Sequence, residues 1–535
     1  MGIPSYFAYL VRNHRSIIKK LDLSTPNRID NLYLDCNSFI YEAHYRLPPN
    51  PNFLAYEDAL IKEVANSLIK MIEHLQPKQR LLIAFDGVAP LAKLNQQRNR
   101  RYMSAYQNSL KAADQAAWNT ASITPGTAFM EKLGTALSLR FARASEFGLQ
   151  QIIVSSSAEP GEGEHKIYEY IRADPAYHRD SQTIIYGLDA DLIMLTLNHL
   201  HISENLYLYR ETPEFIKHID KTLNPNENYL LDIPLFAQII IQELAGSTTE
   251  PKTNYALNDN RLFDYILLCF FLGNDFLPHF PALNIRTTGI QNLVNAYKFV
   301  FQVQGQQTQG PGETLTQNRE IIWKNVRKFI AHLAAHELEY IQEEYIQRAK
   351  MSKRLMYQKD AEADENLLLP LKERAHELYI NPPETGWEAR YYKILFQIRI
   401  DDDRRQEICT NYLEGLEWTM KYYSTGCADW RWKYHYAYPP LLGDLIKHVP
   451  YFDRTFVVKQ PKQPVAPLVQ LSYVLPPSSM GLIPHALYQK LLAEHSDWYV
   501  VEDYEFLWAF CKFFWEAHVE LPHINIDALE AVVNA

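Results

Sequence analysis

The sequence of 535 residues is poor in cysteine, glycine and long apolar runs. Its five cysteines show no Cys-x-x-Cys spacing, which excludes a zinc finger or a disulfide framework and favours a reducing compartment. Only 19 glycines are present, so collagen-like and low-complexity chains are excluded. The longest apolar stretch, residues 265–272, is far below the about 20 residues of a membrane span. Because the N-terminus is not signal-like either, we expect an intracellular protein without a membrane partner, with the cytoplasm favoured over the nucleus.

Several common ligand-binding motifs are also missing. There is no Gly-x-x-x-x-Gly-Lys phosphate loop, and Gly161 and Gly163 lack the third glycine of a dinucleotide-binding fingerprint. His332 and His336 lack the intervening glutamate of a zinc-peptidase helix. The sequence therefore gives no support to the nucleotide-binding and zinc-peptidase chemistry that these motifs mark.

The composition that remains is that of an ordinary globular protein of several domains, with 47% hydrophobic and 22% charged residues. Aromatic residues reach 13%, as 35 Tyr, 24 Phe and 9 Trp, and such side chains either fill large cores or stack on planar ligands. The formal net charge of -10 does not favour a polyanionic ligand. Net charge, however, averages over surface that a ligand never touches, so this class of ligand stays open.

The pattern of apolar segments between residues 31 and 205 is typical of an α/β fold. Four short apolar runs predict core strands at residues 31–34, 81–85, 151–155 and 183–187. Amphipathic segments between them predict helices, for example over 58–75 and 127–140. We therefore expect a mostly parallel central sheet flanked by helices, followed by a helical, aromatic-rich second region.

Carboxylates follow the predicted strands with unusual regularity. In open α/β sheets, ligands bind beyond the carboxyl ends of the strands, and a further acid follows the apolar segment 264–272. The seven candidates are Asp35, Asp86, Glu162, Glu164, Asp189, Asp191 and Asp275. Any single one could be a helix cap or a turn residue, but caps do not explain acids after four successive strands.

Crowded carboxylates repel one another unless cations lie between them. All-oxygen coordination selects Mg²⁺, or Mn²⁺ in its place, over zinc. Two such ions about 3.5–4 Å apart stabilise the attacking and leaving oxygens in phosphodiester hydrolysis. The carboxylates therefore predict a site for two Mg²⁺ ions.

A basic segment follows Asp86 directly. Residues 87–113 contain no acid and carry a local charge of +5, from Lys93, Arg98, Arg100, Arg101 and Lys111. In a helix, one face would present the donors Lys93, Gln97, Arg100 and Arg101. Such a fork of donors suits a terminal phosphate. A solvated basic helix is the alternative, and the proximity of Asp86 favours the phosphate site.

A second aromatic feature is the segment 426–436, which interleaves planar rings with cations. This pattern is typical of a base-stacking platform for nucleic acid. An aromatic core with tyrosine hydroxyls at its edge explains the same composition. The sequence leaves both interpretations open.

Taken together, the motifs resemble those of the eukaryotic 5′→3′ exoribonuclease family. The N-terminal ones are Met1-Gly2-Ile3-Pro4, Leu34-Asp35-Cys36-Asn37, Ala84-Phe85-Asp86-Gly87, Pro160-Gly161-Glu162-Gly163-Glu164-His165-Lys166, Gly187-Leu188-Asp189-Ala190-Asp191-Leu192 and Gly273-Asn274-Asp275-Phe276-Leu277-Pro278. Residues 390–393, 414–418 and 430–436 are similar to the second region that the family shares.

The resemblance also implies a domain organisation. A PIN-like nuclease core, related to flap endonucleases, is expected over residues 1–301, and the Gln-, Gly- and Thr-rich residues 302–317 predict a surface loop or boundary. The second shared region, expected to complete the active-site pocket, covers 318–450 and continues through 451–535. We expect a monomeric, compact form of the family, such as a virus or a protist encodes.

By the same resemblance, the enzyme needs Mg²⁺ and processively removes nucleoside 5′-monophosphates from single-stranded RNA with a 5′-monophosphate. The seven carboxylates are then both the catalytic residues and the metal ligands. The terminal phosphate is bound by Lys93, Gln97, Arg100 and Arg101. Asn37 supports the site, and Tyr41 stands where the family has a histidine that stacks on the first base. Either Trp430 or Trp432 is the second stacking residue.

Two other functions remain as alternatives. The same carboxylate core serves flap-type, structure-specific DNA endonucleases, and a non-catalytic RNA-binding scaffold is the third reading. The basic helix and the aromatic second region favour the exoribonuclease over the flap endonuclease. The presence of all seven acids disfavours the scaffold.

Overall fold

The computed structural model describes residues 3, 5–21, 29–109, 118–210, 222–224, 227–246, 256–301, 313–357, 367–499 and 504–535. The chain forms two compact units. The unit that we call the helical unit consists of residues 1–9, 238–460 and 503–520. The other, called the sheet unit, consists of residues 10–237, 461–502 and 521–535. Most of the boundary predicted at 302–317 lies outside the described residues, and the predicted domain limits stay predictions.

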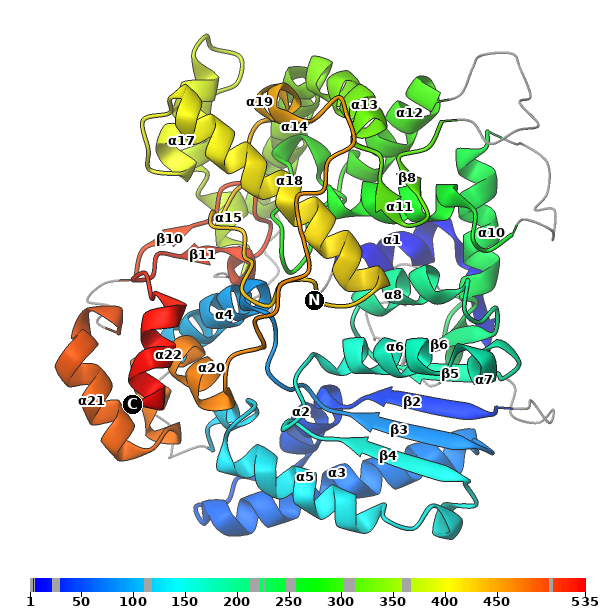
Figure 1. Cartoon of the computed structure of the whole chain (residues 1–535). Coiled ribbons are helices and arrows are strands. Elements are labelled where there is room, and N and C mark those ends of the chain that lie inside the picture. Colours follow the sequence, from blue (N-terminus) through cyan, green and yellow to red (C-terminus); the bar gives the residue numbers. More distant parts are fainter. Residues whose placement is uncertain are drawn as a thin grey trace. The chain divides into compact units, whose positions relative to one another are not determined.

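The sheet unit is built on a seven-stranded sheet of order β1-β7-β6-β5-β2-β3-β4 (Figure 1). Its strands are β1 (Ile18–Lys20), β2 (Asn31–Asp35), β3 (Arg80–Ala84), β4 (Gln151–Ser155), β5 (Thr183–Tyr186), β6 (Leu206–Arg210) and β7 (Tyr229–Leu231). The five strands from β6 to β4 are parallel, and only β7 and β1 pair antiparallel. The predicted mostly parallel sheet is confirmed.

Helices cover both faces of this sheet, which explains why its strands are apolar throughout. Figure 1 shows α3 (Phe53–Leu75) and α5 (Ala128–Arg140) on one face, with α6 (Gly163–Ala173) and α8 (Asp191–His199) on the other. The four predicted strands are present, with ends that differ by at most one residue. The prediction missed β1, β6 and β7; β1 and β7 are only three residues long and carry little pattern.

The other helices that the structure describes in the sheet unit come from both its N-terminal and its C-terminal segments. They are α2 (Asn37–Arg46), α4 (Leu91–Ser109), α7 (Pro175–Arg179), α20 (Pro467–Val474), α21 (His485–His495) and α22 (Ile526–Asn534). A second apolar core joins the start of α4 to the C-terminal helices, with Leu94, Val469 and Leu529 among its buried members. The basic segment is therefore helical over Leu91–Ser109, and Lys111 lies outside the described residues.

The helical unit contains most of the aromatic residues after position 320. Its helices are α11 (Asn260–Phe270), α12 (Gly289–Phe301), α13 (Trp323–Ala335), α14 (Glu337–Tyr357), α15 (Leu369–Lys372), α16 (Ala375–Ile380), α17 (Trp387–Leu395), α18 (Asp402–Ser424) and α19 (Leu442–His448). Two short hairpins pair β8 (Thr316–Gln317) with β9 (Glu320–Ile321) and β10 (Phe506–Leu507) with β11 (His518–Val519). Along α1 (Tyr6–Asn13) and α10 (Ile233–Leu244) the chain passes from one unit to the other.

Much of the aromatic content fills the core of the helical unit. Trp323, Trp418, Tyr391, Tyr412 and Tyr423 are all less than 2% exposed. For these residues the core interpretation holds, because their rings are buried and several pack against neighbouring aromatic rings in edge-to-face and stacked pairs. Across the parts of the chain that are described, no helix combines the length and the apolar character that a membrane crossing needs.

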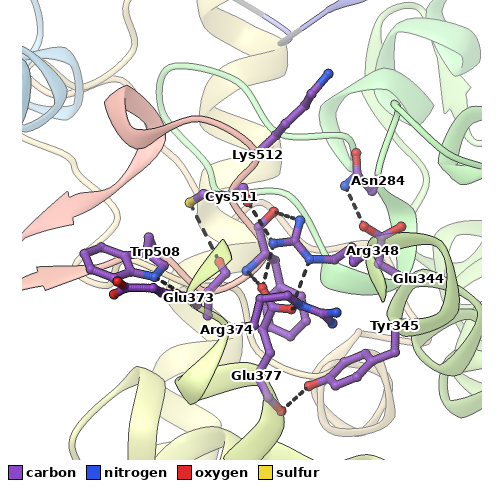
Figure 2. Close-up of polar contacts among 12 residues, drawn as sticks. Asn284, Glu344, Tyr345, Arg348, Glu373, Arg374, Glu377, Trp508, Cys511 and Lys512 are labelled. Atoms are coloured by element: carbon purple, nitrogen blue, oxygen red, sulfur yellow. Dashed lines mark hydrogen bonds and ion pairs between the residues drawn. The ribbon is translucent and has the colours of Figure 1, made fainter. Parts of the chain in front are cut away.

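A buried ion pair ties three segments of the helical unit together (Figure 2). Arg348 of α14 donates from Nη2 to Oε1 of Glu377 at 2.6 Å and from Nε to Oε2 at 3.0 Å. The same guanidinium donates to the carbonyl oxygens of Phe510 and Cys511 at 3.2 and 2.8 Å. Arg374 adds a second cation at 2.6 Å from Glu377. Both partners of this pair are satisfied without any ligand.

Candidate metal and phosphate site

The parallel strands bring three of the predicted acids to one edge of the sheet. Leu34 of β2 is paired with Ile83 of β3 on one side and with Tyr186 of β5 on the other. Asp35 ends β2, Asp86 follows β3 by two residues, and Asp189 follows β5 by three. Because the carboxyl ends of neighbouring parallel strands meet at one edge, acids far apart in sequence converge there.

The Gly-Glu-Gly-Glu segment joins this group through its unusual backbone. Glu162 is extended, with φ -70° and ψ 149°, and Glu164 lies in the first turn of α6, so the two carboxylates do not diverge as they would within one helix. Gly163 is needed between them, because a Cβ atom there would lie 2.6 Å from Oδ1 of Asp35. One carboxylate oxygen each from Asp35, Asp86 and Glu164 lies within 4.8 Å of the others.

His165 belongs to the same surroundings, although the sequence reasoning assigned it no role. A ring nitrogen of His165 and carboxylate oxygens of Glu162 and Glu164 lie within 4.8 Å of one another. His165 is 7% exposed, and burial, assisted by the charge of Lys93, holds the pKa of its imidazole well below the usual range. The motif contained this signal, since His165 directly follows Glu164.

The electrostatics of the cluster favour a cation from outside. Burial, together with the charges of Asp86 and Asp189, raises the pKa of Asp35 well above its usual range. Burial and the charges of Glu162 and Asp35 do the same to the pKa of Glu164. Oδ1 of Asp35 is buried and has no hydrogen-bond partner. Several crowded carboxylate oxygens, one of them without a hydrogen-bond partner, fit the coordination of a hard divalent cation.

Asp86 is oriented by neighbours on two different segments. Asn37 donates from Nδ2 to one oxygen of Asp86, and its own Oδ1 accepts the Asp86 backbone N–H at 3.2 Å. The backbone N–H of Gly163 donates to Oδ1 of Asp86 at 2.7 Å. Asn37 therefore lies in the predicted site and contacts an acid directly.

Lys166 is a member of the site region that the sequence reasoning overlooked. Its ammonium donates to the carbonyl oxygens of Phe85 and Ser156, both at 2.8 Å. These two residues follow β3 and β4, so the buried lysine joins the two loops that carry Asp86 and Glu162. Burial lowers the pKa of Lys166 to about 8.

Asp189 and Asp191 lie at the end of β5 and the start of α8. Asp191 is 2% exposed, and its backbone N–H donates to Oδ1 of Asp189 at 3.2 Å. Arg210, the last residue of β6, is close enough that the charge of Asp189 partly offsets the effect of burial, which lowers the pKa of Arg210 to about 10. This arginine was not predicted, since the sequence did not reveal β6.

Asp275 belongs to the helical unit, in the turn that follows α11. The turn is held by Asn274, whose Oδ1 accepts the backbone N–H groups of Phe276 and Leu277, each at 2.9 Å. Asp275 itself is 7% exposed. Its membership in the carboxylate cluster of the sheet unit stays a prediction.

Helix α4 presents the predicted phosphate ligands. Lys93 is paired with Glu162 at 2.5 Å, so the basic face contacts the carboxylate cluster. Oε1 of Gln97 and Nε of Arg101 are buried and have no hydrogen-bond partner, whereas Arg100 is exposed. Burial lowers the pKa of Arg101, and the neighbouring Tyr41 hydroxyl acts in the opposite direction.

The predicted stacking residues differ in how far their rings are engaged. Tyr41, on α2, is 38% exposed. Trp432 stacks on Trp418 with ring centroids 5.1 Å apart. Trp430 is partly exposed, and no ring contact to it occurs among the described residues. Both tryptophans belong to the helical unit.

Comparison with known proteins finds two family regions along the chain. The family described as XRN 5′-3′ exonuclease N-terminus matches residues 1–212, and the one described as Xrn1 helical domain matches residues 256–377 and 372–535. The second match alone covers more than half of the chain.

Relatives are similar over nearly the whole chain. The 5′-3′ exoribonuclease 2 homolog of Drosophila melanogaster is 28% identical over 98% of this chain and 70% of its own length. The 5′-3′ exoribonuclease 1 of Schizosaccharomyces pombe is 26% identical over 99% of this chain, which spans 48% of that protein. The human 5′-3′ exoribonuclease 1 is 27% identical over 94% of this chain, which spans 32% of that protein. With its parallel sheet, its carboxylate cluster and both family regions, the chain belongs to the XRN family of 5′-3′ exoribonucleases.

Proposed function

We propose that this exoribonuclease hydrolyses single-stranded RNA from a 5′-monophosphate end, processively, with Mg²⁺ held by the carboxylate cluster, and releases nucleoside 5′-monophosphates. The observation that carries the proposal is the contact between Lys93 and Glu162. It joins the basic face of α4 to the acids at the sheet edge. When this face binds the terminal phosphate of an RNA, the next phosphodiester therefore lies within reach of the carboxylate cluster.

The residues present fit divalent cations. Within the sheet unit, the metals would be held by Asp35, Asp86, Glu162, Glu164, Asp189 and Asp191, and Asp275 is the proposed seventh ligand. Two bound Mg²⁺ ions, or Mn²⁺ in their place, supply positive charge to the attacking and leaving oxygens of the phosphodiester. The unpaired Oδ1 of Asp35 and the raised pKa values of Asp35 and Glu164 support this assignment.

The donors of α4 bind and orient the RNA end. Gln97 and Arg101 have buried polar atoms without a hydrogen-bond partner, and a terminal phosphate would satisfy the guanidinium of Arg101. Lys93, which here pairs with Glu162, would be available to the phosphate if that carboxylate held a cation. We expect a 5′-triphosphate or a cap to be rejected, because added phosphates displace the scissile bond from the reacting position.

Aromatic rings hold the bases without reading them. Tyr41 is next to Arg101, so its exposed ring can stack on the first base. Trp430 is the better second candidate, because Trp432 already stacks on Trp418. Stacking accepts every base, as a processive nuclease requires.

The test compares four substrates: the same RNA with a 5′-monophosphate, a 5′-hydroxyl or a 5′-triphosphate, and a flap DNA. We expect Mg²⁺-dependent release of nucleoside 5′-monophosphates from the first RNA, little turnover of the others, and none with a chelator. Preferential cleavage of the flap DNA, or indifference to the 5′ group, would overturn the proposal.

Arg101→Ala isolates the phosphate pocket. We expect it to lower kcat/KM on 5′-monophosphate RNA by about 10- to 100-fold and to change the 5′-hydroxyl substrate much less, because a charge-assisted hydrogen bond contributes about 1.5–3 kcal/mol. Arg179→Ala, at an exposed arginine of the same unit, is the control. Equal losses on both RNA ends would place Arg101 outside the phosphate pocket.

A further inference from the structure

A second face of helix α4, which carries both apolar and polar side chains, packs against the C-terminal helices. With 3.6 residues per turn, the face formed by Leu94, Asn95, Arg98 and Tyr102 is centred roughly 130° around the helix from the centre of the phosphate-ligand face. Leu94 is buried against the cluster that contains Val469 and Leu471 of α20. The helix that carries the proposed phosphate ligands therefore rests on a segment about 380 residues later in the sequence.

Hydrogen bonds fix this contact in register. The side chain of Gln470, which is fully buried, accepts the backbone N–H of Ala89 at 3.1 Å. The Tyr473 hydroxyl donates to Oδ1 of Asn95. Arg98 adds two bonds to backbone carbonyls, at 2.7 Å to Pro522 and at 3.3 Å to Trp498. Arg98, which contributes to the basic charge of this segment, thus serves to anchor the helix.

In the sequence, the residues that these hydrogen bonds hold alternate with the proposed metal and phosphate ligands. Ala89 lies three residues after Asp86, and Asn95 lies between Lys93 and Gln97. Gln470 and Tyr473 therefore hold the short stretch that connects a metal ligand to the phosphate ligands. A movement of α4 along its axis would separate the two halves of the site without removing any ligand.

We propose that Gln470 and Tyr473 are positioning residues for recognition of the 5′-phosphate end: they set the distance between the basic face of α4 and the carboxylate cluster. The inference rests on the proposed function, because its kinetic test measures how well the enzyme discriminates between 5′ ends. Its physical basis is the sensitivity of a reacting geometry to displacement, since about 1 Å of misplacement can cost on the order of 10²-fold in rate.

The test uses two matched tyrosine variants. Tyr473→Phe removes the hydroxyl that bonds to Asn95 of α4. Tyr499→Phe removes a hydroxyl from the same apolar cluster, but that hydroxyl bonds to the carbonyl oxygen of Ser472, at 3.0 Å, and not to α4. Each deletes one buried hydrogen bond, so both variants should lose stability to a similar extent. Only Tyr473→Phe should affect the site.

The expected result is a change in discrimination. The ratio of kcat/KM for 5′-monophosphate RNA to that for 5′-hydroxyl RNA should fall about 3- to 10-fold in Tyr473→Phe and stay at the wild-type value in Tyr499→Phe. Asn95→Ala should reproduce the loss, and the double variant Asn95→Ala/Tyr473→Phe should lose no more than either single one. Unchanged discrimination in Tyr473→Phe, with a stability loss like that of Tyr499→Phe, would overturn the proposal.

A second readout keeps this inference separate from the proposed function. Hydrogen exchange of the metal-free, RNA-free protein should be faster over residues 91–109 in Tyr473→Phe than in Tyr499→Phe. If the wild-type enzyme itself ignores the 5′ group, the proposed function fails, and the exchange rates alone decide on the anchoring. Equal exchange rates in the two variants would then refute it.

Discussion

Buried carboxylates occur in both compact units, with opposite surroundings. In the helical unit, Glu377 is 1% exposed, and its two oxygens accept from Arg348, Arg374 and the backbone N–H of Phe510. In the sheet unit, Asp35 has carboxylates as its charged neighbours, and its Oδ1 has no hydrogen-bond partner. In the first group, the fold itself supplies the compensating charges and the hydrogen-bond donors. The second lacks a compensating charge, and by our proposal a divalent cation supplies it.

The difference separates a structural charge from a functional one. A buried ion pair with full hydrogen bonding holds segments in place, and removal of one partner leaves an uncompensated charge. Several acids of like charge at one sheet edge destabilise the folded chain, and such an arrangement is typical of a site that binds a ligand. Burial alone therefore does not identify the site; the sign of the neighbouring charges does.

The largest expected effect comes from Asp35→Asn. We expect kcat to fall on the order of 10³-fold or more, because metal stabilisation of the transition state is worth several kcal/mol. The unfolding free energy without metal should stay the same or rise, since one of the mutually repelling carboxylates is gone. Single-turnover cleavage and urea unfolding in a chelator measure the two. Asp180→Asn, at an exposed acid, should change neither, and a large loss of stability in Asp35→Asn would make Asp35 structural.

Glu377→Ala should show the reverse pattern, a loss of stability without a loss of activity. We expect the unfolding free energy to fall by about 3–5 kcal/mol, because Arg348 keeps a buried charge without its partner. Activity per folded molecule should stay near that of the wild type. Urea denaturation measures the loss, and Arg348→Met/Glu377→Ala should recover part of it. A loss under about 1 kcal/mol would show that the ion pair is not the anchor that its geometry indicates.

Glu337 tests an intermediate case, a buried carboxylate held by backbone N–H groups. It accepts from Leu442 and Gly443 at 2.6 and 2.8 Å, and burial raises its pKa from 4.5 to about 7. The folded protein then keeps the proton up to about pH 7, whereas the unfolded chain loses it near pH 4.5. Stability therefore falls as the pH rises across this range, by up to about 3 kcal/mol.

Glu337→Gln removes this titration. The variant should lose less unfolding free energy between pH 5 and pH 8 than the wild type, as measured by urea denaturation at both pH values. The overall stability cost of the substitution should be about 1–3 kcal/mol, because the amide nitrogen of Gln cannot accept one of the two backbone N–H groups. Parallel pH profiles for the two proteins would mean that Glu337 ionises with an ordinary pKa.

The addition of Mg²⁺ should separate the two carboxylate groups directly. At a concentration 100 times the dissociation constant, a bound ion raises the unfolding free energy by about 2.7 kcal/mol. We expect this gain in the wild type and in Arg348→Met/Glu377→Ala, and its loss in Asp35→Asn. Thermal unfolding with and without Mg²⁺ measures it. An equal gain in Asp35→Asn would locate the ion elsewhere.

Local pattern was sufficient for the sheet and for most of the site's composition. The strands β2, β3, β4 and β5 were predicted because parallel strands covered on both faces leave continuous apolar runs. Asp35, Asp86 and Asp189 were predicted as neighbours because strand polarity puts all carboxyl ends at one edge. By contrast, β1 and β7 are too short to carry a pattern.

The aromatic segment shows where composition stops being informative. Trp430 and Trp432 are two residues apart and have the same chemistry, so the sequence left their roles open. The fold distinguishes them, because Gly415 of α18 leaves room for the Trp432 ring: a Cβ atom there would lie 2.9 Å from it. Packing against a distant helix, rather than residue type, engages one face of the half-buried Trp432 ring.

The sequence by itself determined the family, the parallel sheet and the set of acids and bases, because these depend on residue type and local periodicity. Only the tertiary structure decided which charges meet. Lys93 pairs with Glu162, Lys166 joins two loops through backbone carbonyls, and Arg98 reaches Pro522. Contacts of this kind depend on how distant segments pack, and backbone acceptors leave no mark in the sequence. For that reason the anchoring of α4 by the C-terminal helices could not be predicted from the sequence alone.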